Sequence, residues 1–360
     1  MAAQLLRIDP FAYRDAIVDF MWRNRAWPYE AKDEYFRFWD WRYRALSESD
    51  STVWILRDND LIVGHVALHY RHCKLGAHVV RVGVPGNFRV DAHYMNSVAG
   101  AMLASAPRKL LNRGELDLVV GCHNEIGQAV AVALGYHNLG EMQALVRVRR
   151  WDRFLGRRAA MLAVAAPLAR VIDAARRAVT RAAFRPPPDH LIVRAITADD
   201  LRALDNSHWE RDSRLTWAGS VAYFAQRFSG GPFQLSRVFA VIDERNGRLE
   251  GLLATVGELM LKVIECEVNQ SILTPPQAVE LLLRAVPDAD SVRVPLLPRS
   301  QLAQEFAAAG YMRLPGRLFE AVMDGDLWSA YWQPSHPLAT QLADTSSWKL
   351  WHGWSARNYQ

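Results

Sequence analysis

The chain has 360 residues, of which 50% are hydrophobic and 22% are charged, a composition typical of folded globular proteins. So much apolar side chain excludes an intrinsically disordered chain, and the lack of an apolar run of about 18 residues excludes a transmembrane helix. Three cysteines are too few and too scattered for a disulfide framework or a zinc site. The N-terminus lacks the features of a secretory signal, so we expect a cytoplasmic protein with, at this length, two domains.

The positive charge is concentrated in one segment. Residues 149–185 contain ten arginines against Asp152 and Asp173, so this segment carries +8 and the rest of a chain with net charge +5 carries −3. Three prolines, Pro186 to Pro188, follow, and a helix cannot continue through them. We call residues 149–188 the basic linker.

The first half of the chain predicts a mixed sheet with helices. Alternating strands at 52–57 and 61–70 flank a turn and are typical of a hairpin. A strand is expected next at 78–84, then a helix at 94–106, a strand at 116–121 and a second helix that ends near Gly135. A last strand is expected to close this half.

The basic linker itself predicts a helix. Apolar residues recur there at spacings of three and four, with arginines elsewhere on the helix: Met161, Val164, Leu168, Ile172, Ala175 and Val179. Pro167 is expected to kink or split this helix. The simplest interpretation packs the apolar stripe between the two halves and leaves the arginines in solvent. Three partners stay open beside it: an anionic membrane surface, the phosphates of a tRNA, and an acidic carrier protein.

The second half repeats the pattern of the first. A hairpin is expected at 237–256, followed by a strand at 262–268, a helix at 276–286, a strand at 291–297 and a helix ending near Gly310. An internal duplication is the simplest account. We therefore predict an α/β (α+β) fold with two mixed-sheet modules, divided as 1–148, the linker 149–188, and 189–360.

Three stretches of the first half resemble the GNAT superfamily of N-acetyltransferases: the hairpin DLIVGH at 60–65, VDAHYMNSVAGAML at 90–103, and LVVGCHNEIGQAVAVALGY at 118–136. The second half shows only the scaffold. The chain is most similar to bacterial GNAT proteins with two modules. The resemblance implies an acyltransferase that uses an acyl-coenzyme A thioester as co-substrate.

The resemblance places the coenzyme A pyrophosphate in the second of these stretches. A pyrophosphate needs several backbone N–H groups at a helix N-terminus, and small residues let the anion approach. Met95 and Val98 depart from the family pattern, which has Arg or Gln and Gly there. The implied cofactor contacts are Val90, Met95, Asn96, Ser97, Val98, Ala99 and Gly100, with Asn124 bound to the pantetheine arm.

The matching loop of the second half, residues 274–278, contains two prolines and no glycine. Proline removes N–H donors, so we expect no coenzyme A in the second module. This module then has a structural role and forms one wall of an acceptor cleft.

Acyl transfer to an amine needs a base, a stabilised oxyanion and an acid for the leaving thiolate. The family's Tyr acid is replaced by Ala131, and the third strand has no Glu base. The candidate catalytic residues are His123 and Asp91. An ordinary imidazole has a pKa near neutrality, which suits His123 to the role of a base. A solvated loop histidine and a simple turn or cap residue are the competing interpretations. No metal is expected, because no H-E-x-x-H spacing occurs.

Two further features have a structural and a functional interpretation. The aromatic run from Trp22 to Tyr43 is core by default, and a lining for a large or planar acceptor is the alternative. His65 and His69 alternate with apolar residues on one strand, so they face one side as a buried pair or as lining of a cleft.

We therefore expect an acyltransferase that moves an acyl group from acyl-CoA to an amine of a small molecule or sugar by direct attack. One alternative keeps the fold and takes an aminoacyl group from charged tRNA, as Fem-type transferases do. The other alternative is a GNAT-like protein that binds without catalysis.

Overall fold

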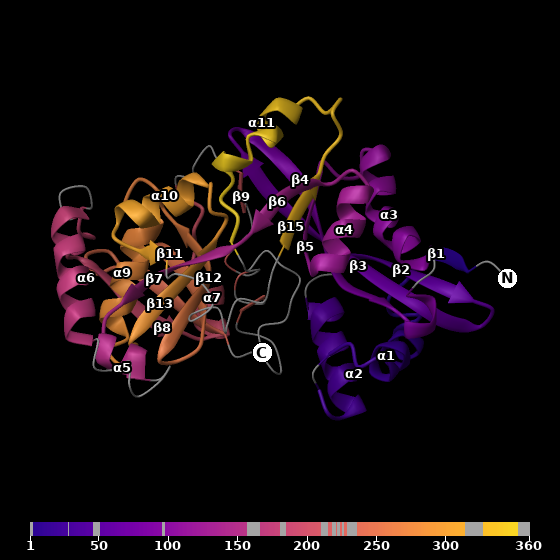
Figure 1. The fold of residues 1–360 in the computed structure, drawn as a ribbon, viewed down its shortest axis with the longest axis horizontal. Helices are drawn as coiled ribbons and strands as arrows, with labels where there is room; N and C mark the ends of the chain where they lie inside the picture. The colour runs from indigo at the N-terminus through magenta and orange to yellow at the C-terminus, as the bar shows by residue number, and fades with distance from the viewer. Residues whose placement is uncertain are drawn as a thin grey trace.

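Two mixed β-sheets lie side by side in this computed structural model (Figure 1). The structure describes residues 3–27, 29–45, 51–95, 98–156, 166–180, 185–209, 215–217, 221, 224, 227–228, 236–313 and 327–351. The α/β fold with two mixed-sheet modules is confirmed.

The first sheet has the strand order β1-β2-β3-β4-β5-β15-β6, with the short β9 beside β3. β4 and β5 are its parallel pair, and the other neighbours are antiparallel. The bounds are β1 Gln4–Ile8, β2 Ser51–Asp58, β3 Leu61–Leu75, β4 His78–Val90, β5 Leu118–His123, β6 His137–Glu141, β9 Thr216–Trp217 and β15 Leu327–Tyr331.

The second sheet has the order β14-β7-β13-β12-β11-β10-β8, and its parallel pair is β12 and β13. The bounds are β7 Gln143–Val148, β8 Leu191–Ile196, β10 Arg237–Asp243, β11 Leu249–Val256, β12 Met260–Val268, β13 Ser291–Leu296 and β14 Met312–Arg313. The position of the parallel pair matches the first sheet, as the duplicated sequence pattern predicts.

The helices cover the first sheet on both faces (Figure 1). Because strand side chains alternate, β2 gives Val53 and Ile55 to the core under α1 and α2, and Trp54 and Leu56 to the core under α3 and α4. The helices and helical turns are α1 Arg14–Arg23, α2 Lys32–Asp40, η1 Trp41–Ala45, η2 Ala92–Tyr94, α3 Ala99–Asn112, α4 Glu125–Ala133, α5 Trp151–Gly156, α6 Ala166–Thr180, α7 Ala198–Arg202, α9 Pro275–Ala285, α10 Gln301–Ala308, α11 Ala339–Ala343 and η4 Thr345–Ser347.

The two sheets exchange strands. The strand after Gly135, β6, and the strand after Gly310, β14, each lie at an edge of the sheet of their own half. β7, from the first half, pairs with β13 and β14 in the second sheet, while β15, from the second half, pairs with β5 and β6 in the first. One of the hydrophobic clusters therefore spans both sheets and contains Val120 and Trp328 together with Phe239 and Ile264. The division at residues 148 and 188 stays a prediction about domains.

The basic linker holds two described helices, α5 and α6. Residues 157–165, with the expected stripe residues Met161 and Val164, lie outside the described residues. Pro167 lies in the first turn of α6, where the missing N–H removes no helical hydrogen bond. In the described part of the chain, no helix is long and apolar enough to cross a membrane.

The interlocked sheets predict that the two halves unfold together. Trp328 of β15 is fully buried, so Trp328→Ala is expected to lower the free energy of unfolding by about 3–5 kcal/mol. β15 pairs within the first sheet, and the hydrophobic cluster that contains Trp328 also contains residues of the second sheet. Circular dichroism and tryptophan fluorescence should therefore report one coincident unfolding transition. Ile126→Ala, at a side chain that is 68% exposed, is the control and should change stability by less than about 0.5 kcal/mol. Two separate transitions, only one of them shifted, would contradict this account.

Candidate functional site

β4 and β5 part toward their C-terminal ends, and we call the gap between their backbones the opening. The two parallel strands pair only at Val82 with Leu118 and Gly83 with Val119. β4 then continues to Val90 beside β3, and β5 continues to His123 beside β15. In α/β sheets, ligands bind outside the carboxyl ends of strands where neighbouring connections diverge. The parting of β4 and β5 is such a place.

The start of α3 follows β4 at the mouth of this opening. Val98 is the N-cap residue, and valine has no side-chain acceptor for the first backbone N–H groups of the helix. A Cβ added to Gly100 would meet no heavy atom of the described residues within 4 Å, so among these residues the space beside this turn is open. Asn96 and Ser97 lie outside the described residues. Backbone donors next to open space are what an anion at a helix N-terminus requires.

The corresponding helix of the second half is closed by its own chain. Thr274 and Gln277 form a capping box at α9, and Pro275 and Pro276 follow the N-cap. The Gln277 side-chain amide also donates to the carbonyls of Arg185 and Pro186 at the end of the basic linker. These contacts support the expectation that a donor site belongs to the first module.

Asn87 forms a bulge in β4 where this strand leaves β5. The register with β3 shifts between the pairs His65–Arg89 and Ala67–Gly86, and Asn87 has a φ of 55°. Left-handed backbone at a bulge is concentrated near functional sites. No expected site included this residue, although a Gly-Asn pair after a proline is a turn signal.

Side chains from three elements hold this bulge. Trp27 Nε1 donates to Asn87 Oδ1 at 3.3 Å, and Asn87 Nδ2 donates to the Tyr43 hydroxyl at 3.1 Å. His65 Nδ1 lies 2.9 Å from the Asn87 carbonyl oxygen and donates to it. The bulge is therefore fixed from the α1–α2 side of the sheet.

Burial keeps these ring groups neutral. It lowers the pKa of His65 to about 4 and raises the pKa of Tyr43 to about 12. Burial and the charge of Arg42 also lower the pKa of His69. His65 and His69 form a buried pair on one face, and the aromatic run packs as core, with its buried members Trp27, Tyr29, Tyr35, Phe38, Trp39 and Tyr43.

His123 ends β5 on the other side of the opening. Its Nε2 lies 2.9 Å from the hydroxyl of Ser329, which the exchanged strand β15 contributes. The imidazole covers Gly121, where an added Cβ would come within 2.5 Å of Nε2, so any larger residue here would displace the ring from its present position. Val119, Gly121 and His123 share the α3–α4 face of the sheet, because strand side chains alternate.

The expected contacts of Asn124 and Asp91 are local in this structure. The Asn124 side chain caps α4 and accepts from the Gly127 N–H at 2.8 Å. The Asp91 carboxylate accepts from the His93 N–H at 3.0 Å and caps η2. Asp91 and His123 thus lie at the ends of the two parted strands, and no hydrogen bond between them occurs among the described contacts.

Three other predicted features are placed as follows. Ala131 is buried against the first-sheet core, so the family's Tyr position offers no phenol. Cys122 packs against the core shared with the second sheet, on the face opposite His123. Among the described residues, no group of three or more His, Cys, Asp or Glu side chains is arranged to hold a metal ion.

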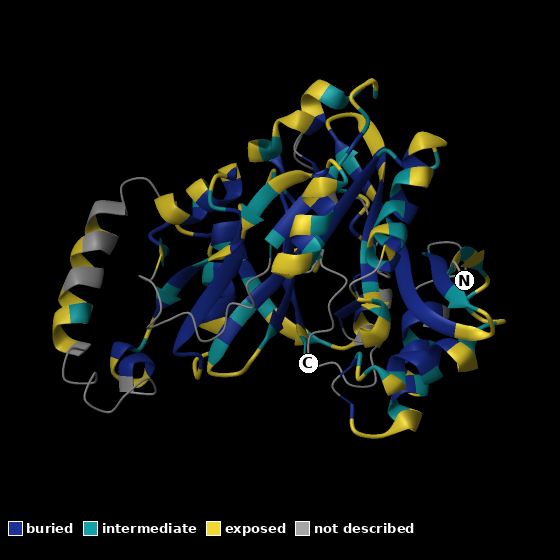
Figure 2. Cartoon of the chain, turned by 45° about the vertical axis from the view of Figure 1, so that its right-hand side comes forward, coloured by how far each residue is buried: buried dark blue, intermediate teal, exposed yellow. Residues whose placement is uncertain are grey.

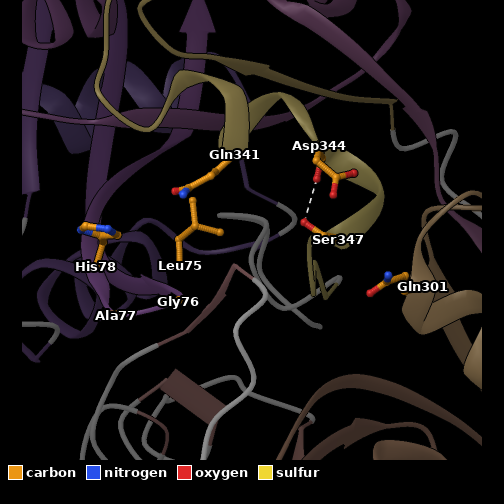
Figure 3. Close-up of a pocket in the computed structure, with 8 residues that line it drawn as sticks. All are labelled: Leu75, Gly76, Ala77, His78, Gln301, Gln341, Asp344 and Ser347. Carbon is orange, nitrogen blue, oxygen red and sulfur yellow. Dashed lines mark hydrogen bonds between the residues drawn. The ribbon is translucent and has the colours of Figure 1, made fainter.

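A separate pocket lies where the turn between β3 and β4 meets α10 and the segment after α11 (Figure 3). It has a volume of about 450 Å³ and an open, mixed polar and apolar lining. It contains none of the predicted site residues, and its lining is Leu75, Gly76, Ala77, His78, Gln301, Gln341, Asp344 and Ser347. The turn is at the end of the β3–β4 hairpin that lies away from the bulge.

The bulge predicts a specific order of stability among variants of Asn87. Asn87→Gly keeps the left-handed backbone and loses the two side-chain hydrogen bonds, whereas Asn87→Ala also strains the backbone. Denaturant unfolding should therefore show the Ala variant less stable than the Gly variant by about 1 kcal/mol. An Ala variant as stable as the Gly variant would show that the backbone at this position is not left-handed.

No family model and no curated protein matches this sequence. Solved structures do match. A protein of unknown function from Enterococcus faecalis, named a probable N-acyltransferase, aligns with a TM-score of 0.58 and 7% identity over 92% of this chain and 73% of its own. A GCN5-related N-acetyltransferase from Anabaena variabilis aligns with a TM-score of 0.55 and 8% identity, over 91% of this chain and 72% of its own. Eis1 from Mycobacterium abscessus aligns with a TM-score of 0.53 and 11% identity, over 92% of this chain and 73% of its own.

These likenesses extend over both sheets, because more than nine-tenths of the chain is covered in each. At such low identity they establish the fold and not the substrate. The chain therefore has the fold of the GCN5-related N-acetyltransferases.

Proposed function

We propose that the protein is an acyltransferase that moves an acyl group from acyl-CoA to an amine of a small molecule or sugar. The observation that carries the proposal is the parting of β4 and β5, with the start of α3 and its open space at the mouth. Structures with the same fold are named N-acyltransferase or N-acetyltransferase, which supports this class of reaction.

In this proposal the donor lies along the opening. Its pyrophosphate binds backbone N–H groups at the start of α3, contributed by residues 95–100, with Val90 beside them. Asn124 faces the pantetheine arm at the end of β5. Backbone N–H groups of the unpaired edge of β4 stabilise the oxyanion, and the Asn87 bulge sets the direction of that edge.

The amine nitrogen attacks the thioester carbonyl directly. The new C–N bond forms, the C–S bond breaks, and the coenzyme A thiolate leaves with the bonding electron pair. His123 is the proposed base for the ammonium proton, with Asp91 as the second candidate. The contact with Ser329 orients the imidazole, so the second half of the chain positions a group of the first.

A donor other than free acyl-CoA is the second proposal. Residues 90–107 contain no Lys or Arg to bind the coenzyme phosphates, whereas residues 149–185 contain ten Arg. Charged tRNA as donor, as in Fem-type transferases, fits that distribution of charge. A protein that binds without catalysis is the remaining alternative, because the family's acid is absent at Ala131.

Gly100→Trp tests the donor site. The open space at Gly100 lets the variant fold, while the indole fills the space beside the first turn of α3. Calorimetric titration with acetyl-CoA and with a longer acyl-CoA should show micromolar binding to the native protein and at least about a tenfold weaker affinity for the variant, a difference of 1.4 kcal/mol or more.

Lys109→Trp is the matched control, since it places the same ring on an exposed position near the other end of α3. It should bind as the native protein does. Absence of heat with every thioester would overturn the acyl-CoA proposal and leave the tRNA donor and the non-catalytic alternative.

His123→Asn tests the proposed base. Loss of a positioned general base typically lowers kcat by about 10²-fold, with little effect on the affinity for the donor. Ser329→Ala should give a smaller loss, because it removes only the orienting contact. Steady-state kinetics with a primary amine as acceptor measures both, and a native kcat in His123→Asn would remove His123 from the mechanism.

A further inference from the structure

Helix α6 presents an exposed apolar stripe. Leu168 and Val171 are 66% and 65% exposed, and Ala174, Ala175 and Ala178 are also exposed. The spacings of three and four put these five residues on one face of the helix. Large apolar side chains exposed in a row mark a surface that contacts another molecule or a membrane.

The described residues leave Leu168 and Val171 largely exposed. α6 packs against α5, where Ala169 contacts the cluster around Trp151, and Arg170 forms a 2.7 Å ion pair with Asp152. The helix lies at the outer side of the second sheet, far from the first (Figure 1), and its described side chains other than the half-buried Ala169 are exposed (Figure 2). Leu168 and Ala175 of the expected stripe are therefore exposed and not packed between the two halves, while the side chains of its other members lie outside the described residues.

Charge selects among the partners that would cover the stripe. The segment 149–185 carries +8 while the rest of the chain carries −3, from a net charge of +5. A second copy placed on the stripe would bring two such segments together, and like charges repel. Nucleic acid would satisfy the arginines and leave the apolar side chains in water. An anionic lipid surface satisfies both the apolar side chains and the arginines.

We propose that α6 is an interfacial helix that binds the surface of an anionic bilayer. Leu168 and Val171 enter the boundary between headgroups and acyl chains, and arginines of the basic linker contact lipid phosphates. The helix lies in the plane of the membrane, since it has 15 residues and no described helix is apolar enough to cross. This inference does not depend on the proposed acyl transfer.

Vesicle co-sedimentation of the full chain tests the proposal. The native protein should bind vesicles of 70% phosphatidylcholine and 30% phosphatidylglycerol, and bind pure phosphatidylcholine far less. The double variant Leu168→Glu, Val171→Glu should lose at least about tenfold in partition coefficient, because it removes apolar contact and adds negative charge. Both side chains are exposed, so thermal unfolding should be that of the native protein.

Leu61→Glu is the matched control, at a leucine that is 60% exposed in the first sheet, and it should keep vesicle binding. Equal binding by the double variant, or no binding of the native protein to the anionic vesicles, overturns the proposal. A tRNA gel shift in the absence of vesicle binding would assign the segment to nucleic acid. A dimer that the double variant dissociates, again without vesicle binding, would assign the stripe to a second copy.

Discussion

The parting of two parallel strands is the constraint on which the candidate site depends. β4 and β5 share two residue pairs and then diverge, because each is held on its far side by a longer antiparallel ladder with β3 or β15. The unpaired edges leave backbone polar groups facing an opening, and buried backbone groups need partners. A ligand with an amide-rich arm and an anionic end could bind here, with the arm along the strand edges and the anionic end at the start of α3.

The surroundings of the opening are fixed by polar contacts from both sides. On the β4 side, neutral His65, Tyr43 and Trp27 hold the left-handed Asn87. On the β5 side, Ser329 holds His123. Ser329 belongs to an exchanged strand, so the first site is complete only when the second half is folded. The second half keeps the scaffold, but the start of its own matching helix is closed by Thr274, Gln277 and the end of the basic linker.

Much of the scaffold could be predicted from the sequence. The duplicated order of strands and helices is visible because alternating apolar and polar residues indicate strands, and apolar residues spaced three and four apart indicate helices. The exchange of β7 and β15 was not predictable in this way, since a strand's sequence shows that it is buried and not which sheet it joins. The exposure of Leu168 was not predictable for the same reason, because the spacing predicts an apolar stripe and only the fold shows which of its described residues meet solvent.

The site residues show the same limit. His123 was predicted to lie just beyond a strand, and it ends β5, because it directly follows an apolar run. Asp91 was predicted from the resemblance to lie just before the pyrophosphate loop, and in the structure it directly follows β4, which extends beyond the expected strand 78–84. Ser329 was missed because it is more than 200 residues from His123, and no local pattern joins them. Asn87 was missed because the expected strand 78–84 ends just before Pro85 and Gly86, and these turn signals do not show that β4 continues past them through a bulge.

Hydrogen–deuterium exchange with and without acetyl-CoA tests the central claim most directly, because it reads the backbone groups that the claim assigns to the donor. A thioester lying in the opening should slow exchange in residues 84–90 of β4, in 98–103 at the start of α3 and in 120–124 at the end of β5. The start of α9 should be unchanged. Protection that appears only in the second sheet, or nowhere at a saturating thioester concentration, would contradict the account.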